Sequence, residues 1–380
     1  MQLHALVYFS FAILAAAASS QFPDLPLVDT YGPNDPRATA TEPAGYRQKH
    51  AAARQEFNSR MKGYDSFDAL TKQRWTSYYN LEVSLPTLLG NWSVAEGWGS
   101  KNKAGTVSKR SYTGSGPDSA SFLSQMKTYL YFAQSAYCAS ANINAWDCSS
   151  CVIANTEDIY AYPSTDGNEQ GYIAVNTNLN AIIVSFRGSS NIENWINNLE
   201  FLPTSVPIPG VSSSVEVHNG FWTVWSTLQA TTFAQLRTYR AAHPTYGVVF
   251  TGHSLGAAVA ILAAVDAVVS GIVPAASTSV IDFGEPRVGN SAFYSYVLSL
   301  GFQQLSRVVN YNDIVPHFPL ESWGFNHHTQ EQWVDSASNL VYCNDVSNGG
   351  EDTNCANTVV PFVSITAHLD YFGIPLGGTC

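Results

Sequence analysis

The stretch "GHSLG", residues 252–256, places a serine between two glycines, directly after the apolar run "YGVVF" and directly before an alanine-rich run. A strand, then G-x-S-x-G, then a helix is the pattern of a nucleophile elbow, a sharp turn that presents the serine hydroxyl for attack. The strained backbone requires small residues two positions before and after the serine, and Gly252 and Gly256 meet that requirement. The helix that follows favours an anion beside Ser254. We predict a nucleophilic serine; the alternative is a packing turn with an idle side chain.

A serine hydroxyl is a weak nucleophile until a base takes its proton, and the base needs a carboxylate to orient it. With this elbow the chain order is serine, then acid, then histidine. Asp313 in "RVVNYNDIVPHFP" lies where a strand ends and a proline-containing loop begins, so we predict that it is the acid. Asp282 falls inside a strand and Glu285 follows it; we interpret both as structural.

The predicted base is His368 in "VSITAHLDYFG", near the C-terminus. His317 is an alternative because it lies on the loop of the predicted acid. The adjacent pair His327 and His328 could suggest a metal, but no cysteine or acid spacing accompanies it, so we interpret it as a polar loop and predict no metal and no cofactor. His253, beside the nucleophile, is expected to pack or hydrogen-bond structurally.

Acyl transfer passes through a tetrahedral oxyanion, which needs hydrogen-bond donors already in place. One donor is the N–H of Leu255, the residue after the serine. The second should come from the loop that ends the strand "AIIVSFRGSS", in which we expect Arg187 to anchor the loop.

Directly after that loop, "NIENWINNLEF" carries one apolar stripe with the i, i+3, i+4, i+7 spacing of a short amphipathic helix. The stripe consists of Ile192, Trp195, Ile196 and Leu199. Such a helix either packs on the core or covers a site in water and moves aside at a lipid surface.

The elements that must position these residues alternate between helix and strand, which predicts a mostly parallel sheet covered by helices on both faces. We expect helices over 121–138, 226–244 (ended by Pro244), 257–270 and 291–301, and strands over 170–178, 181–188, 246–252, 278–286 and 305–313.

The first twenty residues combine an apolar run with small residues and predict a secretory signal peptide, although this stretch has no Lys or Arg. A signal anchor is the alternative; no later stretch is long and apolar enough to span a membrane. Six cysteines, an even number in an exported chain, predict three disulfides. "CSSC" at 148–151 could be a redox motif, but we interpret it as a small structural loop.

Residues 21–110 carry a net charge of +3, whereas the remainder of the chain carries −14. The stretch ends in the dibasic pair Lys109–Arg110, which we interpret as a processing site rather than a charged linker. We therefore predict a signal peptide over 1–20, a propeptide over 21–110 that binds its own domain in cis, and a catalytic domain over 111–380.

The stretches "FRGSSNIENW", "TGHSLGAA", "FGEPRVGN", "NDIVPHFP" and "AHLDYFGI" resemble the fungal class 3 triacylglycerol lipases of the Rhizomucor and Rhizopus type. The similarity runs through essentially all of 111–380. It implies an α/β-hydrolase fold with a short helical lid over 190–200, and a triad of Ser254, Asp313 and His368. Glu193 is a departure, because close relatives carry a basic residue there.

The resemblance also implies further site residues. It places the second oxyanion donor at Ser189, which is otherwise a plain turn residue. It assigns Phe201, Val315 and Leu369 to an acyl groove, although each could equally be core. It pairs the cysteines as Cys138–Cys380, Cys148–Cys151 and Cys343–Cys355.

We therefore expect a secreted, monomeric serine lipase that hydrolyses triacylglycerols at the lipid–water interface and binds no nucleic acid. A phospholipase A1 or a feruloyl esterase on the same fold is the nearest alternative. A feruloyl esterase should have a more polar lid than "IENWIN". A non-catalytic binding protein of the same fold and a serine protease are more distant alternatives.

Overall fold

The computed structural model describes residues 119–189, 192, 203–319, 321–335, 339–345, 351–352, 354–358 and 364–377. Contacts between Cα atoms divide the chain into two units, 1–103 and 104–380, and every described residue belongs to the second. The predicted signal peptide and propeptide lie outside the described residues. Over the described ranges, we find no helix with the length and apolar character that a membrane crossing requires.

An eight-stranded sheet forms the centre of this unit, in the order β1-β2-β3-β6-β7-β8-β9-β10. The run from β3 to β9 is parallel, whereas β1, β2 and β10 at the edges pair antiparallel. The strands are β1 (Thr156–Pro163), β2 (Gln170–Asn176), β3 (Ala181–Phe186), β6 (Gly247–Gly252), β7 (Thr278–Phe283), β8 (Gln304–Asn310), β9 (Glu331–Val334) and β10 (Leu340–Tyr342). Two small hairpins lie apart from it, β4 (Pro203–Ser205) with β5 (Glu216–His218) and β11 (Asp370–Tyr371) with β12 (Ile374–Pro375).

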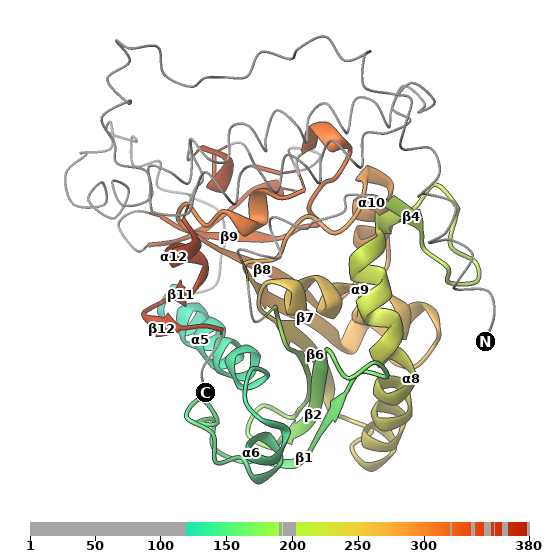
Figure 1. The fold of residues 1–380 in the computed structure, drawn as a ribbon, viewed down its shortest axis with the longest axis vertical. Helices are drawn as coiled ribbons and strands as arrows, with labels where there is room; N and C mark the ends of the chain where they lie inside the picture. Colours follow the sequence, from blue (N-terminus) through green and yellow to red (C-terminus); the bar gives the residue numbers. More distant parts are fainter. Residues whose placement is uncertain are drawn as a thin grey trace, which may run out of the picture. The chain divides into compact units, whose positions relative to one another are not determined.

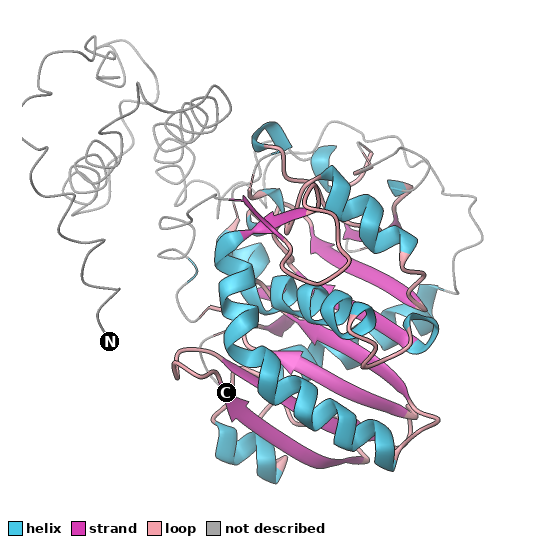
Figure 2. Ribbon diagram, turned by 90° about the vertical axis from the view of Figure 1, so that its right-hand side faces the viewer, coloured by secondary structure: helices cyan, strands magenta, loops and turns pink. Residues whose placement is uncertain are grey.

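Helices cover both faces of the sheet (Figures 1 and 2). Because successive strand residues point to opposite faces, Val280 of β7 joins the core under α8, α9 and α10, whereas Ile281 joins the core under α5. The helices are α5 (Ser119–Ser135), α6 (Ser140–Ala145), α8 (Asn219–Ala242), α9 (Leu255–Val269), α10 (Ser291–Ser299) and α12 (Ile365–His368). Short 3₁₀ turns occupy Ala275–Ser277, Val315–His317, Glu321–Trp323 and Ala356–Thr358. The predicted mostly parallel, helix-covered sheet is confirmed.

The structure differs from the sequence prediction mainly at element ends and sheet edges. Helix α8 begins seven residues before the predicted position 226, at Asn219, because the His218 imidazole caps it by accepting a hydrogen bond from the Phe221 N–H. It ends at Ala242, ahead of Pro244. Strand β9 was not predicted: it has four residues and begins with the buried charge Glu331, so it lacks an apolar pattern.

Disulfides join Cys148 to Cys151 and Cys343 to Cys355, two of the pairs that the resemblance implies. Cys138 is also disulfide-bonded, and its predicted partner Cys380 lies outside the described residues.

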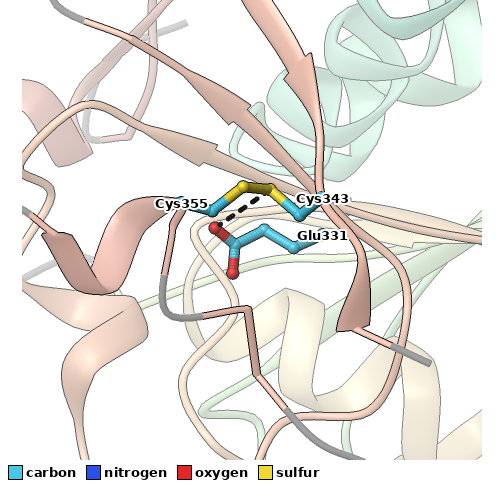
Figure 3. Close-up of side chains that lie close together, drawn as sticks. All are labelled: Glu331, Cys343 and Cys355. Carbon is cyan, nitrogen blue, oxygen red and sulfur yellow. Dashed lines mark hydrogen bonds between the residues drawn. A yellow bond between two sulfur atoms is a disulfide. The ribbon is translucent and has the colours of Figure 1, made fainter. Parts of the chain in front are cut away.

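Figure 3 shows the Cys343–Cys355 disulfide against the Glu331 carboxylate, whose Oε1 lies 3.6 Å from the Cys343 sulfur. The same oxygen accepts a hydrogen bond from the Ala356 N–H. Both sulfurs are in the disulfide and offer no thiolate, so these three side chains do not form a metal site.

Candidate active site

Ser254 lies between β6 and α9 with φ +61° and ψ −128°, a conformation that residues with a side chain rarely adopt. A Cβ atom on Gly252 would lie 2.3 Å from the Gly256 carbonyl carbon, and one on Gly256 would lie 2.2 Å from the Phe186 carbonyl oxygen. Both glycines are therefore required by close backbone approach. Phe186 ends β3, so the elbow packs directly on the loop that follows that strand.

The Asp313 carboxylate accepts three hydrogen bonds. The Val315 N–H donates to Oδ1 at 2.8 Å, while the Tyr371 hydroxyl and His368 Nδ1 contact Oδ2 at 2.5 and 2.9 Å. A carboxylate only accepts, so Nδ1 of His368 carries the proton and Nε2 presents a lone pair. Burial and the neighbouring Asp313 charge raise the pKa of Tyr371 well above its usual value, so the phenol remains a donor.

The end of β7 supports both the serine and the histidine. The Phe283 carbonyl accepts a hydrogen bond from the Ser254 N–H, and Gly284, at φ +59°, lies against the His368 ring so closely that a Cβ there would be 2.9 Å from it. Ser254, Asp313 and His368 are all fully buried. Within the described part of the chain, Ser254 Oγ and His368 Nε2 have no hydrogen-bond partner.

His253 links the histidine to the loop after β3. Its Nε2 lies 2.8 Å from the His368 carbonyl oxygen and must donate, so Nδ1 accepts from the Tyr137 hydroxyl, also at 2.8 Å. Gly188, in that loop, lies so close to the same hydroxyl that a Cβ atom there would be 2.1 Å from it. Burial, and then the nearby His368, lower the pKa of His253 well below its usual value, so the ring stays neutral and structural. Neither Tyr137 nor Tyr371 was predicted: Tyr137 belongs to no motif, and Tyr371, although inside "AHLDYFGI", is a type of residue that the triad pattern does not require.

Replacing Tyr137 with phenylalanine is expected to cost about 1–3 kcal/mol of unfolding free energy, because it leaves the buried His253 Nδ1 without a donor. Thermal unfolding of Tyr137→Phe measures this loss. Tyr160→Phe is the matched control, because that side chain is 41% exposed. An equal effect of the two changes would contradict the interpretation.

The two expected oxyanion donors lie beside the elbow. Leu255 begins α9 and is buried, and Ser189 follows β3 and is half-buried. Arg187 holds this loop by donating from Nη2 to the Asn168 carbonyl.

The expected lid and acyl-groove residues are only partly described. Ile192 is buried, and Trp195, Ile196, Leu199, Glu193 and Phe201 lie outside the described residues. Val315 is fully buried next to the predicted acid, and Leu369 is half-buried.

Stability is expected to depend on the protonation of Glu169, next to Arg187. Burial raises the pKa of Glu169 to about 7, with Arg187 opposing the shift. In the unfolded chain the pKa of a glutamate is about 4.3. Between this pKa and the folded pKa, Glu169 is protonated in the folded state and ionised in the unfolded state. The free energy of unfolding therefore falls as the pH rises from about 5 to 8. The glutamine of Glu169→Gln cannot titrate. Between pH 5 and 8 the free energy of unfolding of this variant should therefore fall by about 1–2 kcal/mol less than that of the wild type. Urea unfolding of both proteins at pH 5 and 8 tests this; identical pH slopes would contradict it.

The alternative histidines occupy other environments. Burial lowers the pKa of His317 to about 3, and its carbonyl accepts a hydrogen bond from Arg287. His327 and His328 lie on a loop ahead of β9, as predicted, but this loop is buried, since each histidine is 2% exposed. Glu285, at the end of β7, contacts both rings.

A parallel sheet with a nucleophile elbow after a central strand, and an acid and a histidine from later in the chain, defines an α/β-hydrolase. The family model "Lipase (class 3)" matches residues 183–323. The chain is 35% identical over 263 residues to a lipase of Rhizomucor miehei, covering 67% of this chain and 70% of that one. It is 33% identical to a secreted mono- and diacylglycerol lipase A of Penicillium cyclopium, covering 67% and 86%. The native Rhizomucor miehei lipase propeptide complex superposes with a TM-score of 0.63 at 33% identity, covering 69% of this chain and 84% of that one.

The chain belongs to the class 3 lipase family. It is a carboxylic ester hydrolase.

Proposed function

We propose that this enzyme is a secreted triacylglycerol lipase in which Ser254 is the nucleophile, His368 the base and Asp313 the orienting acid. The observation that carries the proposal is the buried Asp313–His368 hydrogen bond beside a strained serine at the elbow. The family membership and the lipases among its relatives support it.

The geometry suggests the following reaction. His368 Nε2 takes the Ser254 proton as Oγ attacks the ester carbonyl, and Asp313 stabilises the imidazolium that forms. The N–H groups of Leu255 and Ser189 donate hydrogen bonds to the oxyanion. The packing of the elbow against the loop after β3, which carries Ser189, supports this role. The imidazolium then protonates the leaving alcohol. Water attacks the acyl-enzyme with the same histidine as base, which releases the fatty acid and restores Ser254.

Interfacial opening of a lid over 190–200 is part of the proposal. The Ser254 side chain is fully buried, so an ester reaches it only after a covering segment moves. The apolar stripe of 192–199 follows the oxyanion loop in sequence and would face lipid once displaced.

The lid is tested by following hydrolysis of a short-chain triacylglycerol as its concentration crosses the solubility limit. A lidded lipase gives a rate that jumps when droplets form. A rate that saturates below the limit, and still requires Ser254, would indicate an esterase without interfacial opening.

A preference for mono- and diacylglycerols is a second candidate, because the Penicillium cyclopium relative is named for those substrates. Initial rates on emulsified tri-, di- and monoacylglycerols with one acyl chain, and on phosphatidylcholine vesicles, separate the two. Rates on triacylglycerol below about a tenth of those on diacylglycerol would favour the second candidate, and activity confined to the vesicles would indicate a phospholipase.

The precursor organisation is also proposed: a signal peptide over 1–20, a propeptide over 21–110 and the mature enzyme over 111–380. The propeptide complex of the Rhizomucor miehei lipase supports a leader that binds its own domain. N-terminal sequencing of the secreted enzyme should give Ser111, and Arg110→Gln should prevent that cleavage.

A further inference from the structure

We propose that Asp282, Glu285 and His328 form a structural Zn²⁺ site beneath the catalytic histidine, with His327 packed against the Glu285 carboxylate. Asp282 belongs to β7, and Glu285 follows the end of that strand. The two histidines precede β9, on the far side of β8. The four residues were not connected in the sequence analysis because about forty residues separate the acids from the histidines.

Both histidines present a lone pair to one carboxyl group. His327 Nε2 lies 2.7 Å from the Pro316 carbonyl and must donate to it, so in the neutral ring Nδ1 carries the lone pair and faces Glu285 Oε1 at 3.6 Å. His328 Nδ1 lies 2.5 Å from the Thr329 carbonyl and must donate, so in the neutral ring Nε2 carries the lone pair and faces Glu285 Oε2 at 2.8 Å. Lone pairs directed at a carboxylate repel unless a cation or protons lie between them.

The acids add further unbalanced charge. Asp282 and Glu285 are both fully buried and face each other, and among the described residues no N–H group or hydroxyl donates to either oxygen of Asp282 or to Oε1 of Glu285. Arg307, the register partner of Asp282 on β8, is instead paired with Glu331 at 2.9 Å. A divalent cation would neutralise the two carboxylates and accept the His328 lone pair at once.

The ligand types fit Zn²⁺, which takes four nitrogen, oxygen or sulfur ligands in a tetrahedron, three or four of them from histidine, carboxylate or cysteine side chains. Tetrahedral bonds of about 2.0 Å put ligand atoms about 3.3 Å apart, between the 2.8 and 3.6 Å measured from the two imidazoles to Glu285. Ligand atoms of Asp282, Glu285 and His328 lie within 4.8 Å of one another.

The second nitrogen of each imidazole donates to a backbone carbonyl, the usual outer partner of a metal-bound histidine. The three ligands that lie together, Asp282, Glu285 and His328, are all buried, so the site would be structural rather than catalytic.

The site would connect two segments that contact the catalytic residues, the end of β7 and the loop that carries Asp313. Gly284, between the two acids' positions, contacts the His368 ring. Through Pro316, His327 contacts the loop that carries Asp313. Zn²⁺ bound to Glu285 and His328 would therefore fix the end of β7 to the segment that carries His327, and through His327 to this loop.

Metal analysis of the tag-free secreted enzyme tests the proposal. We expect about one Zn²⁺ per chain by mass spectrometry of the metal content, and a fall in Tm of at least about 5 °C after chelation, reversed by Zn²⁺ at 100 times its Kd. Glu285→Gln and His328→Gln should each lower the metal content at least tenfold and abolish the response of Tm to Zn²⁺. His243→Gln, a partly exposed histidine elsewhere, should retain both.

Asp282→Asn distinguishes the metal from shared protons, the rival explanation for the same contacts. Asparagine mimics a protonated carboxyl. If the carboxyl groups share protons, Asp282→Asn would preserve or raise Tm, and chelation would leave the Tm of the wild type unchanged. If the site binds Zn²⁺, Asp282→Asn should lower both the metal content and Tm. Wild-type enzyme that contains no metal and whose Tm is unchanged by 100 μM Zn²⁺ would overturn the proposal.

Discussion

Replacing Ser254 with alanine is expected to lower kcat at least about 10⁴-fold, because only the serine oxygen can form the acyl-enzyme. Ser254→Gly should lose the same activity, yet raise the unfolding free energy by about 1 kcal/mol. Glycine adopts φ +61° without the strain that serine and alanine both carry there. Hydrolysis of a soluble ester together with thermal unfolding measures both effects.

The contrast between the two Ser254 variants separates chemistry from fold. Loss of activity in both, with higher stability only in the glycine variant, is the expected pattern. Activity of Ser254→Ala within about tenfold of wild type would exclude this residue as the nucleophile.

Asp313→Asn is expected to lower kcat about 10³–10⁴-fold at neutral pH, with little change in KM. The two carboxylate oxygens accept from three donors, whereas an amide has one oxygen and must turn an NH₂ group toward one of them. If the NH₂ faces His368, the imidazole is held in the tautomer that cannot accept the serine proton.

Asp266→Asn is the matched control for Asp313→Asn. Asp266 is also buried and accepts hydrogen bonds, from Trp225 and Gln229, but it belongs to α9 away from the triad. The Asp266→Asn variant should have a lower free energy of unfolding than the wild type and an unchanged kcat. Equal kcat losses in the two variants would mean that the Asp313 effect is one of folding.

The sequence was sufficient to predict the class of fold and the three candidate triad residues because each is tied to a local pattern. Ser254 lies in a strand–turn–helix motif, and Asp313 lies where a strand gives way to a loop. The elbow pattern predicts that positions 252 and 256 require small residues. The structure gives the reason, since a methyl group at Gly256 would overlap the Phe186 carbonyl.

What the sequence could not indicate are contacts between residues far apart in the chain. Tyr137 contacts His253, 116 residues away, and Glu285 contacts His328, 43 residues away. The sequence around each of these residues carries no pattern that would indicate its partner. Only the order of strands β7, β8 and β9 in the sheet brings Glu285 and His328 together.

Residues 364–377 complete both the proposed triad and the packing of α5, the first described helix. His368 joins an acid 55 residues earlier, and the Gly377 N–H donates to the Gln134 side chain on α5, 243 residues earlier, while Leu376 enters the core under that helix. Such long-range contacts give a high contact order, which slows folding. Until residues 364–377 have been synthesised, therefore, α5 lacks these closing contacts and Ser254 lacks the histidine proposed as its base. A nascent or C-terminally truncated chain would have a formed elbow without hydrolytic activity.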